Sequence, residues 1–177
     1  NGTAITYDAI GNPLNDGSWT YEWAVGRQLK KMSREGQSLT FKYDHNGMRI
    51  QKVLEHSWYP ETTNYTYHGK LLTHMEVAYT DFDEVGHVDK LHFFYDARPR
   101  PVKVRFNGTV YTYVQNLQGD IVGILDNNGN LVVEYKYNAW GTQLSRTGEL
   151  ANTLGYANPF RYRGYIYDDE TWMYWLR

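Results

Sequence analysis

The chain has 177 residues, 41% of them hydrophobic and 16% aromatic, and it contains 17 tyrosines but no cysteine. The absence of cysteine excludes a disulfide scaffold, a thiolate zinc site and a cysteine nucleophile. Eighteen Lys and Arg residues against 20 Asp and Glu residues give a net charge of −2, so the chain has no positive field for nucleic acid. No apolar run approaches the roughly 20 residues needed to cross a bilayer.

The sequence starts at Asn1 rather than at a methionine, and no Ser- or Pro-rich linker interrupts it. We therefore expect residues 1–177 to form one segment, without an internal domain boundary, of a larger protein. Any targeting signal is then expected outside this segment.

Tyrosine is more frequent than Phe and Trp combined, although the mean hydropathy is −0.67. A tyrosine ring packs well on a pleated surface while its hydroxyl stays hydrated. Together with 16 glycines, this composition favours short strands joined by tight turns.

In chain order, the first feature is a short repeat. Its copies begin at Tyr7-Asp8 (with Gly11), Trp23, Tyr43-Asp44 (with Gly47), Tyr95-Asp96 and Tyr137-Asn138 (with Gly141). The spacings of 16 and 20 residues between positions 7, 23 and 43 are too short for a helix pair and suit a two-stranded unit.

Residues 38–53 show the pattern of one unit. Leu39, Phe41 and Tyr43 alternate on one face of a predicted strand, and Asp-x-x-Gly then turns the chain. The Asp side chain is expected to accept a hydrogen bond from the backbone two residues on, with Gly supplying a positive φ. In the returning strand the alternation places Met48 and Ile50 on one face and Arg49 and Gln51 on the other.

Hairpins continue through the second half. Residues 63–67 turn at His68-Gly69-Lys70 into Leu71, and residues 103–106 turn at Asn107-Gly108 into 109–114. Residues 121–125 turn at 126–130 into 131–137. The best helical candidate is Leu144–Leu154, although Gly148 and its Thr residues disfavour a helix.

The motifs resemble the RHS/YD-repeat family. They are the YDxxGN-type copies, residues 115–121 and 135–141, and above all residues 158–171, which read NPFRYRGYIYDDET. The resemblance covers nearly the whole chain and points to the C-terminal part of the RHS core of a bacterial polymorphic toxin, similar to wall-associated proteins. It implies an all-β fold in which repeated antiparallel hairpins form a curled sheet within a hollow β-shell.

The resemblance also marks the repeat-motif positions expected to be structural: Tyr7, Asp8, Gly11, Tyr43, Asp44, Gly47, Tyr95, Asp96, Tyr137, Gly141, Asn158, Pro159, Phe160, Arg161, Tyr162, Gly164, Tyr167 and Asp168. Trp172 departs from the family, which usually has Gly there. Many members cleave themselves at a motif that would follow Arg177, so neither that activity nor a toxin carries over to this segment.

Three groups of polar residues are candidates for chemical sites. The acidic residues of 81–89 resemble a calcium loop, but Val85 and His92 occupy positions that need oxygen ligands, which favours a solvated hairpin loop. His68 and His74 would share one strand face, but two ligands do not specify a metal site. Asp168 and Asp169 point to opposite faces of a strand, so we expect them to shape a turn. We expect no catalytic residue, metal or cofactor.

Aromatic side chains are the remaining candidates. Trp19, Trp23, Tyr43, Trp58, Tyr95 and Trp140 are expected to make core or inter-hairpin contacts, with stacking on sugars as the alternative.

The expected function is that of a non-enzymatic shell segment of a secreted or surface-displayed toxin, with the rest of the shell and an enclosed C-terminal toxin as partners. A glycan or cell-surface binding module is the alternative, and an enzyme would need a carboxylate pair or His cluster in a cleft. Edge strands left open at both ends predict self-association.

Overall fold

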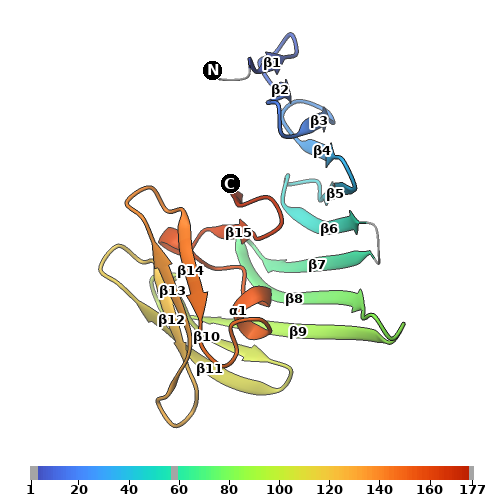
Figure 1. Ribbon diagram of the computed structural model, residues 1–177. Coiled ribbons are helices and arrows are strands. Elements are labelled where there is room, and N and C mark those ends of the chain that lie inside the picture. The colour runs from blue at the N-terminus through green and yellow to red at the C-terminus, as the bar shows by residue number, and fades with distance from the viewer. Residues whose placement is uncertain (1–3, 57–59, 176–177) are drawn as a thin grey trace. The chain divides into compact units, whose positions relative to one another are not determined.

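The computed structural model describes residues 4–56 and 60–175, whose regular secondary structure is almost entirely β-strand (Figure 1). The strands are β1 (Thr6–Tyr7), β2 (Pro13–Asn15), β3 (Thr20–Trp23), β4 (Leu29–Arg34), β5 (Gln37–Tyr43), β6 (Arg49–His56), β7 (Glu61–His68), β8 (Leu71–Thr80), β9 (Gly86–Tyr95), β10 (Pro101–Phe106), β11 (Thr109–Gln115), β12 (Ile121–Leu125), β13 (Leu131–Tyr137), β14 (Gln143–Thr147), β15 (Ile166–Asp168) and β16 (Met173–Trp175). The helical elements are the short α1 (Leu154–Ala157) and the 3-10 turn η1 (Tyr162–Gly164).

Strands β1 to β14 pair in chain order in one antiparallel sheet, and β15 pairs with β16 in a second sheet. Each strand therefore bonds to its sequence neighbours, which is the arrangement that successive hairpins produce. The prediction of an all-β fold built from antiparallel hairpins is confirmed.

Contacts divide the chain into two compact units: Asn1–Thr66 with Met75–Val88, and Tyr67–His74 with Asp89–Arg177. The first unit has a core on one face of β3 to β6. Its buried members are Trp19, Tyr21, Met32, Leu39, Phe41 and Leu54, and Tyr43 packs against them. Leu39, Phe41 and Tyr43 thus share a face, as the alternation predicted.

The alternation predicted for residues 48–51 is wrong. Arg49 is buried at 2% exposure, whereas Ile50 is 38% exposed. The register shifts between Lys42 and Tyr43, so that Tyr43 pairs with Arg49 and Lys42 with Gln51. This bulge leaves Ile50 unpaired and exposed, whereas Arg49 and Met48 (8% exposed) are both buried, so the strict alternation is broken.

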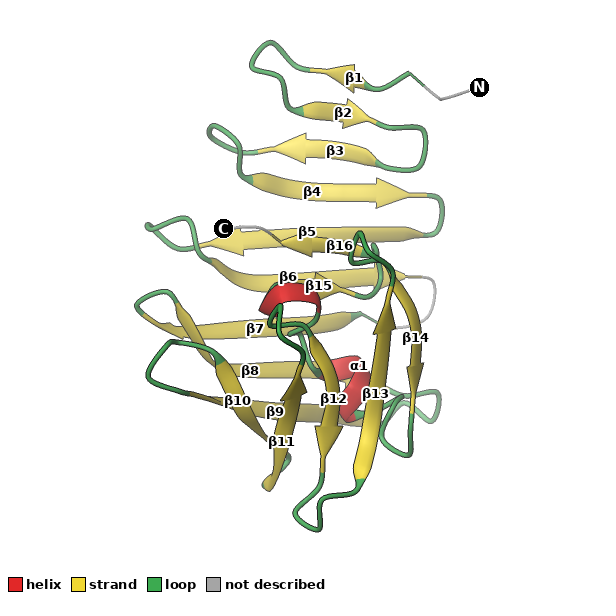
Figure 2. Cartoon of the chain, turned by 90° about the vertical axis from the view of Figure 1, so that its left-hand side faces the viewer, coloured by secondary structure: helices red, strands yellow, loops and turns green. Residues whose placement is uncertain are grey.

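The second unit is built on β9 to β14, with α1 in contact with β13 and η1 in contact with β12 (Figure 2). Its core combines aliphatic residues of the sheet with aromatic residues and the C-terminal segment. The buried side chains include Leu91, Phe93, Val104, Phe106, Tyr113, Ile121, Ile124, Val133, Tyr135, Leu154, Phe160 and Ile166.

The tightest predicted turn in this unit is confirmed at Asn107-Gly108, which joins β10 to β11. The φ angles of the two residues are +47° and +91°. Positive φ at both central residues is the requirement of a type I′ hairpin turn.

The helix expected at Leu144–Leu154 is absent. Residues 143–147 form β14, whose Arg146 pairs with Tyr135 of β13, and α1 begins only at Leu154. Gly148, directly after β14, has a φ of +114° and lies against the backbone of Val132. Sheet pairing therefore determines this segment, whose own helix propensity is low. No helix among the described residues has the length and apolar character required to span a membrane.

Candidate functional site

The repeated turn has one hydrogen-bonding pattern, found at the seven Asp or Asn residues 8, 44, 81, 96, 116, 126 and 138. In each, side-chain Oδ1 accepts from the backbone N–H groups two and four residues on, at 2.8 to 3.0 Å. The backbone N–H of the same residue donates to the carbonyl four residues on. The predicted bond to the second residue is confirmed, and the bond to the fourth closes the loop.

The backbone N–H donors to Asp44 come chiefly from Met48 and then from Asn46, and they hold the pKa of Asp44 below its ordinary value of 3.8. The pKa of Asp8 is lowered in the same way, chiefly by the N–H of Asn12. A carboxylate that accepts several N–H bonds is stabilised in its ionised form. Where the turn residue is Asp, it is therefore an ionised acceptor whose hydrogen bonds lie within its own loop.

The aromatic residue just before the turn bonds back to the preceding hairpin. The hydroxyl of Tyr43 donates to the carbonyl of Leu29 (2.9 Å), that of Tyr95 to Leu72 (2.6 Å) and that of Tyr137 to Ile121 (2.8 Å). In the shortened copy, Nε1 of Trp23 donates to the carbonyl of Pro13 (2.7 Å). These bonds between hairpins explain why the repeat needs Tyr rather than Phe. Tyr7, in the first copy, is instead 56% exposed.

Arg161 is the centre of the second unit. Its side chain is 1% exposed and its guanidinium lies 4.3 Å above the centroid of the Tyr135 ring. It donates to the carbonyls of Gly155 (2.6 Å) and Asn158 and to Oε1 of Gln143 (3.2 Å). The guanidinium is therefore surrounded by acceptors and an aromatic face, as a buried cation requires.

Asp169 supplies the negative charge of this centre. Its Oδ2 accepts from Arg161 (3.4 Å) and from Arg146. Burial alone lowers the pKa of an arginine, but Tyr135 and Asp169 outweigh this and raise the pKa of Arg161. Burial also raises the pKa of Tyr135, so its ring faces the guanidinium as a neutral phenol at neutral pH. The sequence pattern predicts only a turn role for Asp169 and not this ion pair, because the partners Arg146 and Arg161 lie 23 and 8 residues away along the chain.

Asn158 and Phe160 attach the C-terminal segment, which also contains Arg161 and Asp169, to the sheet. Oδ1 of Asn158 accepts from the Tyr113 hydroxyl (2.6 Å), and its Nδ2 donates to the carbonyl of Phe160 (2.9 Å). The Phe160 ring meets Phe93 edge to face at a centroid distance of 4.9 Å, and Tyr95 and Tyr113 lie at 6.3 and 6.4 Å. Desolvation raises the pKa of Tyr113, so its hydroxyl stays a neutral donor.

The other motif positions have local roles. The carbonyl of Pro159 accepts from the N–H of Tyr167, and the N–H of Gly164, at a φ of +67°, donates to the carbonyl of Arg161. The Tyr167 ring lies 5.9 Å from the Arg161 guanidinium. The carbonyl of buried Asp168 accepts from Thr171 and Trp172 and so closes the β15–β16 turn.

Trp172 adopts the conformation that glycine adopts easily. Its φ is +59°, and its side chain is 80% exposed. Its N–H donates to the carbonyl of Asp168 at 2.9 Å. The turn thus forms with Trp in place of Gly, in a left-handed conformation that is unfavourable for a residue with a Cβ.

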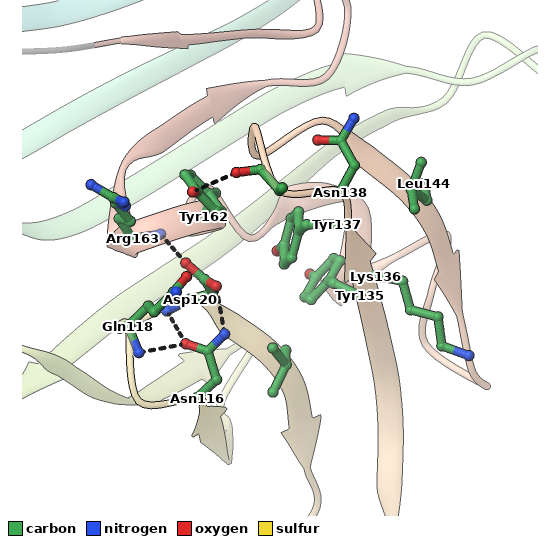
Figure 3. A pocket seen from close by; sticks show the side chains of 12 residues that line it. Asn116, Gln118, Asp120, Tyr135, Lys136, Tyr137, Asn138, Leu144, Tyr162 and Arg163 are labelled. Carbon is green, nitrogen blue, oxygen red and sulfur yellow. Dashed lines mark hydrogen bonds between the residues drawn. The ribbon is translucent and has the colours of Figure 1, made fainter.

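A hollow of the second unit lies between the turns 116–120 and 138–142 and η1, with a volume of about 620 Å³ (Figure 3). Asp120 is buried here, but its Oδ1 accepts from the N–H of Arg163 (2.8 Å) and its Oδ2 from Nδ2 of Asn116 (2.5 Å). The Tyr162 hydroxyl donates to the carbonyl of Ala139 (3.2 Å). The carboxylate at this hollow therefore joins one turn to another through both of its oxygens.

Comparison with known proteins places these features in a family context. No protein-family model matches the chain. It is 36% identical over 182 residues to the tRNA nuclease WapA of Bacillus subtilis strain 168 and 35% identical to the tRNA3(Ser)-specific nuclease WapA of Bacillus spizizenii. Each match covers 99% of this chain but only 7% of the relative.

Solved structures share the fold. The crystal structure of TcdB2-TccC3-TEV superposes with a TM-score of 0.78 at 16% identity, over 96% of this chain and 9% of that chain. The Photorhabdus luminescens Tc holotoxin pore, with a TccC3 mutation, gives 0.76 at 17% identity over 96% and 8%. The chain is an RHS-like repeat segment. The resemblance inferred from the YD copies and from residues 158–171 is thereby supported over nearly the full chain.

The RHS segment does not bring the other candidate site residues together. Residues 81–85 are one more copy of the repeated turn and lie within the predicted hairpin loop, where Oδ2 of Asp81 is 2.7 Å from Nε2 of His87. His68 ends β7 and His74 lies in β8, so the two histidines lie on neighbouring strands joined by the turn at 69–70 and not on one strand. Among the described residues, no group of three or more His, Cys, Asp or Glu is arranged to hold a metal ion.

The aromatic residues of the RHS segment divide into two groups. Trp19 is buried, and Trp23, Tyr43 and Tyr95 are half-buried and packed or hydrogen-bonded, as predicted. Trp140 contradicts the prediction, because it is 88% exposed at the third position of its turn. Trp58 lies outside the described residues.

Proposed function

We propose that this RHS segment, residues 1–177, is a non-enzymatic structural part of the shell of a secreted or surface-displayed polymorphic toxin. Its partners are the rest of the shell and a C-terminal toxin domain that the shell encloses or presents. The relatives named as tRNA nucleases are far longer than this segment, which leaves room for such a domain elsewhere in the protein.

The observation that carries the proposal is how residues 158–169 use their polar groups. Arg161, Asn158 and Asp169 are the side chains best suited to act on a ligand, and each is bonded within the fold. Arg161 and Asn158 are buried at 1% exposure. The charged and amide groups of this motif bond to turns and strands of the same chain, which supports a structural role.

Protease protection in the full-length protein tests the shell role. We expect a C-terminally tagged protein to keep its C-terminal domain intact under proteinase K. Phe160→Ala, which removes a ring packed by Phe93 and two tyrosines, is expected to expose that domain. Phe82→Ala is the matched control, because Phe82 is 85% exposed. A C-terminal domain that is digested in the native protein as fast as the free domain would refute the shell role.

A second candidate function is binding of a glycan or cell-surface receptor. It rests on Trp140 and Trp172, which are 88% and 80% exposed and have no packing role in the fold. Exposed indole rings stack on sugar faces at low entropic cost. Glycan-array binding by the chain that is lost in Trp140→Ala or Trp172→Ala would favour this function, and an array without signal would remove it.

A further inference from the structure

Residues 154–169 contact the sheet through α1, which lies against β13, and through η1, which lies against β12 (Figure 2). The segment follows β14 through residues 148–153, where Gly148, Glu149, Asn152 and Thr153 are exposed. Its contacts to the sheet arise from side chains that are distant in sequence. The attachment of the segment therefore rests on many contacts besides the covalent link.

Apolar recognition centres on Phe160. Its ring is 3% exposed and sits among Phe93 of β9, Tyr95 at the end of β9, and Tyr113 of β11. All three contacts are edge to face, which is a favoured geometry for aromatic pairs. An aromatic anchor in a preformed aromatic pocket is typical of a binding hot spot.

Polar groups of the sheet bind the side chains on either side of Phe160, namely Asn158 and Arg161. Tyr113 and Tyr135 present their hydroxyls to the amide of Asn158, at 2.6 and 3.4 Å. Gln143 of β14 accepts from Nε of Arg161, whose guanidinium lies over the Tyr135 ring. The sheet thus offers a donor and an acceptor to the Asn158 amide, and an acceptor and a ring face to the Arg161 guanidinium.

Backbone contacts fix the register. The N–H of Ile121 in β12 donates to the carbonyl of Arg161 (3.1 Å). The carboxylate of Asp120 accepts from the N–H of Arg163 (2.8 Å). The sheet thus holds both the side chains and the main chain of the segment, as a peptide-binding groove does.

We propose that the face of β9 to β14 is a binding groove for the Asn-Pro-Phe-Arg segment and that it retains this segment without the covalent link. Residues 153–175 are a separable ligand, which the groove accepts from its own chain or, after displacement, from an identical segment added in trans. The proposal does not depend on the shell role, because it concerns only how one part of the chain binds another.

A nicked form of the full chain tests the groove. A site-specific protease sequence inserted between Asn152 and Thr153, both exposed, is cleaved after purification. We expect the piece from Thr153 onward to co-elute with the sheet on size-exclusion chromatography and the near-UV circular dichroism of the intact protein to persist. A synthetic fluorescent peptide of residues 153–177 should then exchange into the nicked protein.

Two variant peptides make the test specific. The Arg161→Ala peptide loses the hydrogen bond to Gln143 and the contact with the Tyr135 ring, so we expect its competing affinity to fall on the order of 100-fold. The Arg163→Ala peptide is the matched control, because it removes only an exposed side chain and keeps the backbone N–H that donates to Asp120. The side chain of Arg163 is exposed and lies over only the ring of its neighbour Tyr162, at 5.3 Å, so its affinity should change by less than about threefold.

Three results would overturn the proposal. In the first, the C-terminal piece dissociates from a sheet that stays folded after cleavage. In the second, the nicked protein loses its near-UV signal, so that the covalent link is required for binding. In the third, the Arg161→Ala and Arg163→Ala peptides compete equally well, so that the retained peptide is bound without use of the arginine contacts.

Discussion

At the residue scale, Gly141 shows how a missing side chain positions the C-terminal segment. A Cβ placed there would lie 2.5 Å from Cδ1 of Tyr162, whose ring packs directly on the turn. The φ of Gly141 is +86°. The Asp-x-x-Gly pattern accounts for the positive φ, but the close approach of Tyr162 from 21 positions further along is a tertiary contact.

Substitution at this position separates the two effects. Gly141→Ala is expected to lower the free energy of unfolding by about 2–5 kcal/mol, from left-handed strain of about 1–2 kcal/mol plus overpacking of about 1–3 kcal/mol. Gly129→Ala is the matched control, because its φ is +85° with no atom within 4 Å of the added carbon. Urea denaturation of both variants checks this, and equal losses would contradict the packing role of Gly141.

Trp172 gives a second prediction at this scale, because it occupies a left-handed turn position at a φ of +59°. Trp172→Gly should raise the free energy of unfolding by about 0.5–1 kcal/mol, since relief of left-handed strain exceeds the added entropy of the unfolded chain. Trp140→Gly serves as the control: Trp140 is similarly exposed but has no positive φ, so a small loss is expected. Thermal unfolding measures both, and a destabilised Trp172→Gly variant would refute the strain.

At the element scale, the hairpin turn depends on one acceptor side chain that serves two backbone donors. The same bonds form whether the residue is Asp, as at position 44, or Asn, as at position 138. The turn geometry therefore needs an oxygen at Oδ1 and not a charge. The charge matters for the pH dependence of stability.

The lowered pKa of Asp44 predicts acid destabilisation. A carboxyl group whose folded pKa is below its unfolded value stabilises the fold above about pH 3.8, and this contribution is lost as the pH falls through the folded pKa. Asp44→Asn keeps the turn bonds and removes the proton uptake, so its stability should fall less between pH 5 and pH 2.

Urea midpoints across this pH range measure the effect. Asp83→Asn is the control, since the exposed Asp83 side chain caps no turn, and its profile should follow that of the native protein. An Asp44→Asn profile as steep as the native one would show that the turn carboxylate does not contribute.

At the scale of the whole molecule, the order of the strands leaves two edges. Within the described residues, β1 bonds only to β2 and β14 only to β13 in the main sheet. Leu144 of β14 is 66% exposed along one of these edges. Unpaired edge strands present free backbone donors and acceptors to any other strand.

The 177-residue chain on its own is therefore expected to self-associate. Leu144→Lys should reduce association, because a charge on an edge strand opposes pairing with a second copy. Val25→Lys is the control, since Val25 is 92% exposed in a turn. Sedimentation velocity over a concentration series measures the effect, and a native chain that stays a monomer at the highest concentration would contradict it.

The sequence by itself determined the local units. Alternation at Leu39, Phe41 and Tyr43, the Asp-x-x-Gly turns and Asn107-Gly108 depend on contacts within a few residues, and the structure contains the strands and turns that they predict. The tyrosine excess is explained by the hydroxyl bonds between neighbouring hairpins, such as that from Tyr43 to Leu29.

Only the tertiary structure decided those features whose residues contact partners far away along the chain. The bulge that buries Arg49 and exposes Ile50 arises from the register between two strands, and β14 replaces a helix because β13 offers it backbone partners. Arg161 forms an ion pair with Asp169, donates to Gln143 and lies over the Tyr135 ring. No local sequence pattern links these residues. Local rules act through chain neighbours, whereas burial of a cation requires acceptors from every side, and only the folded sheet brings them together.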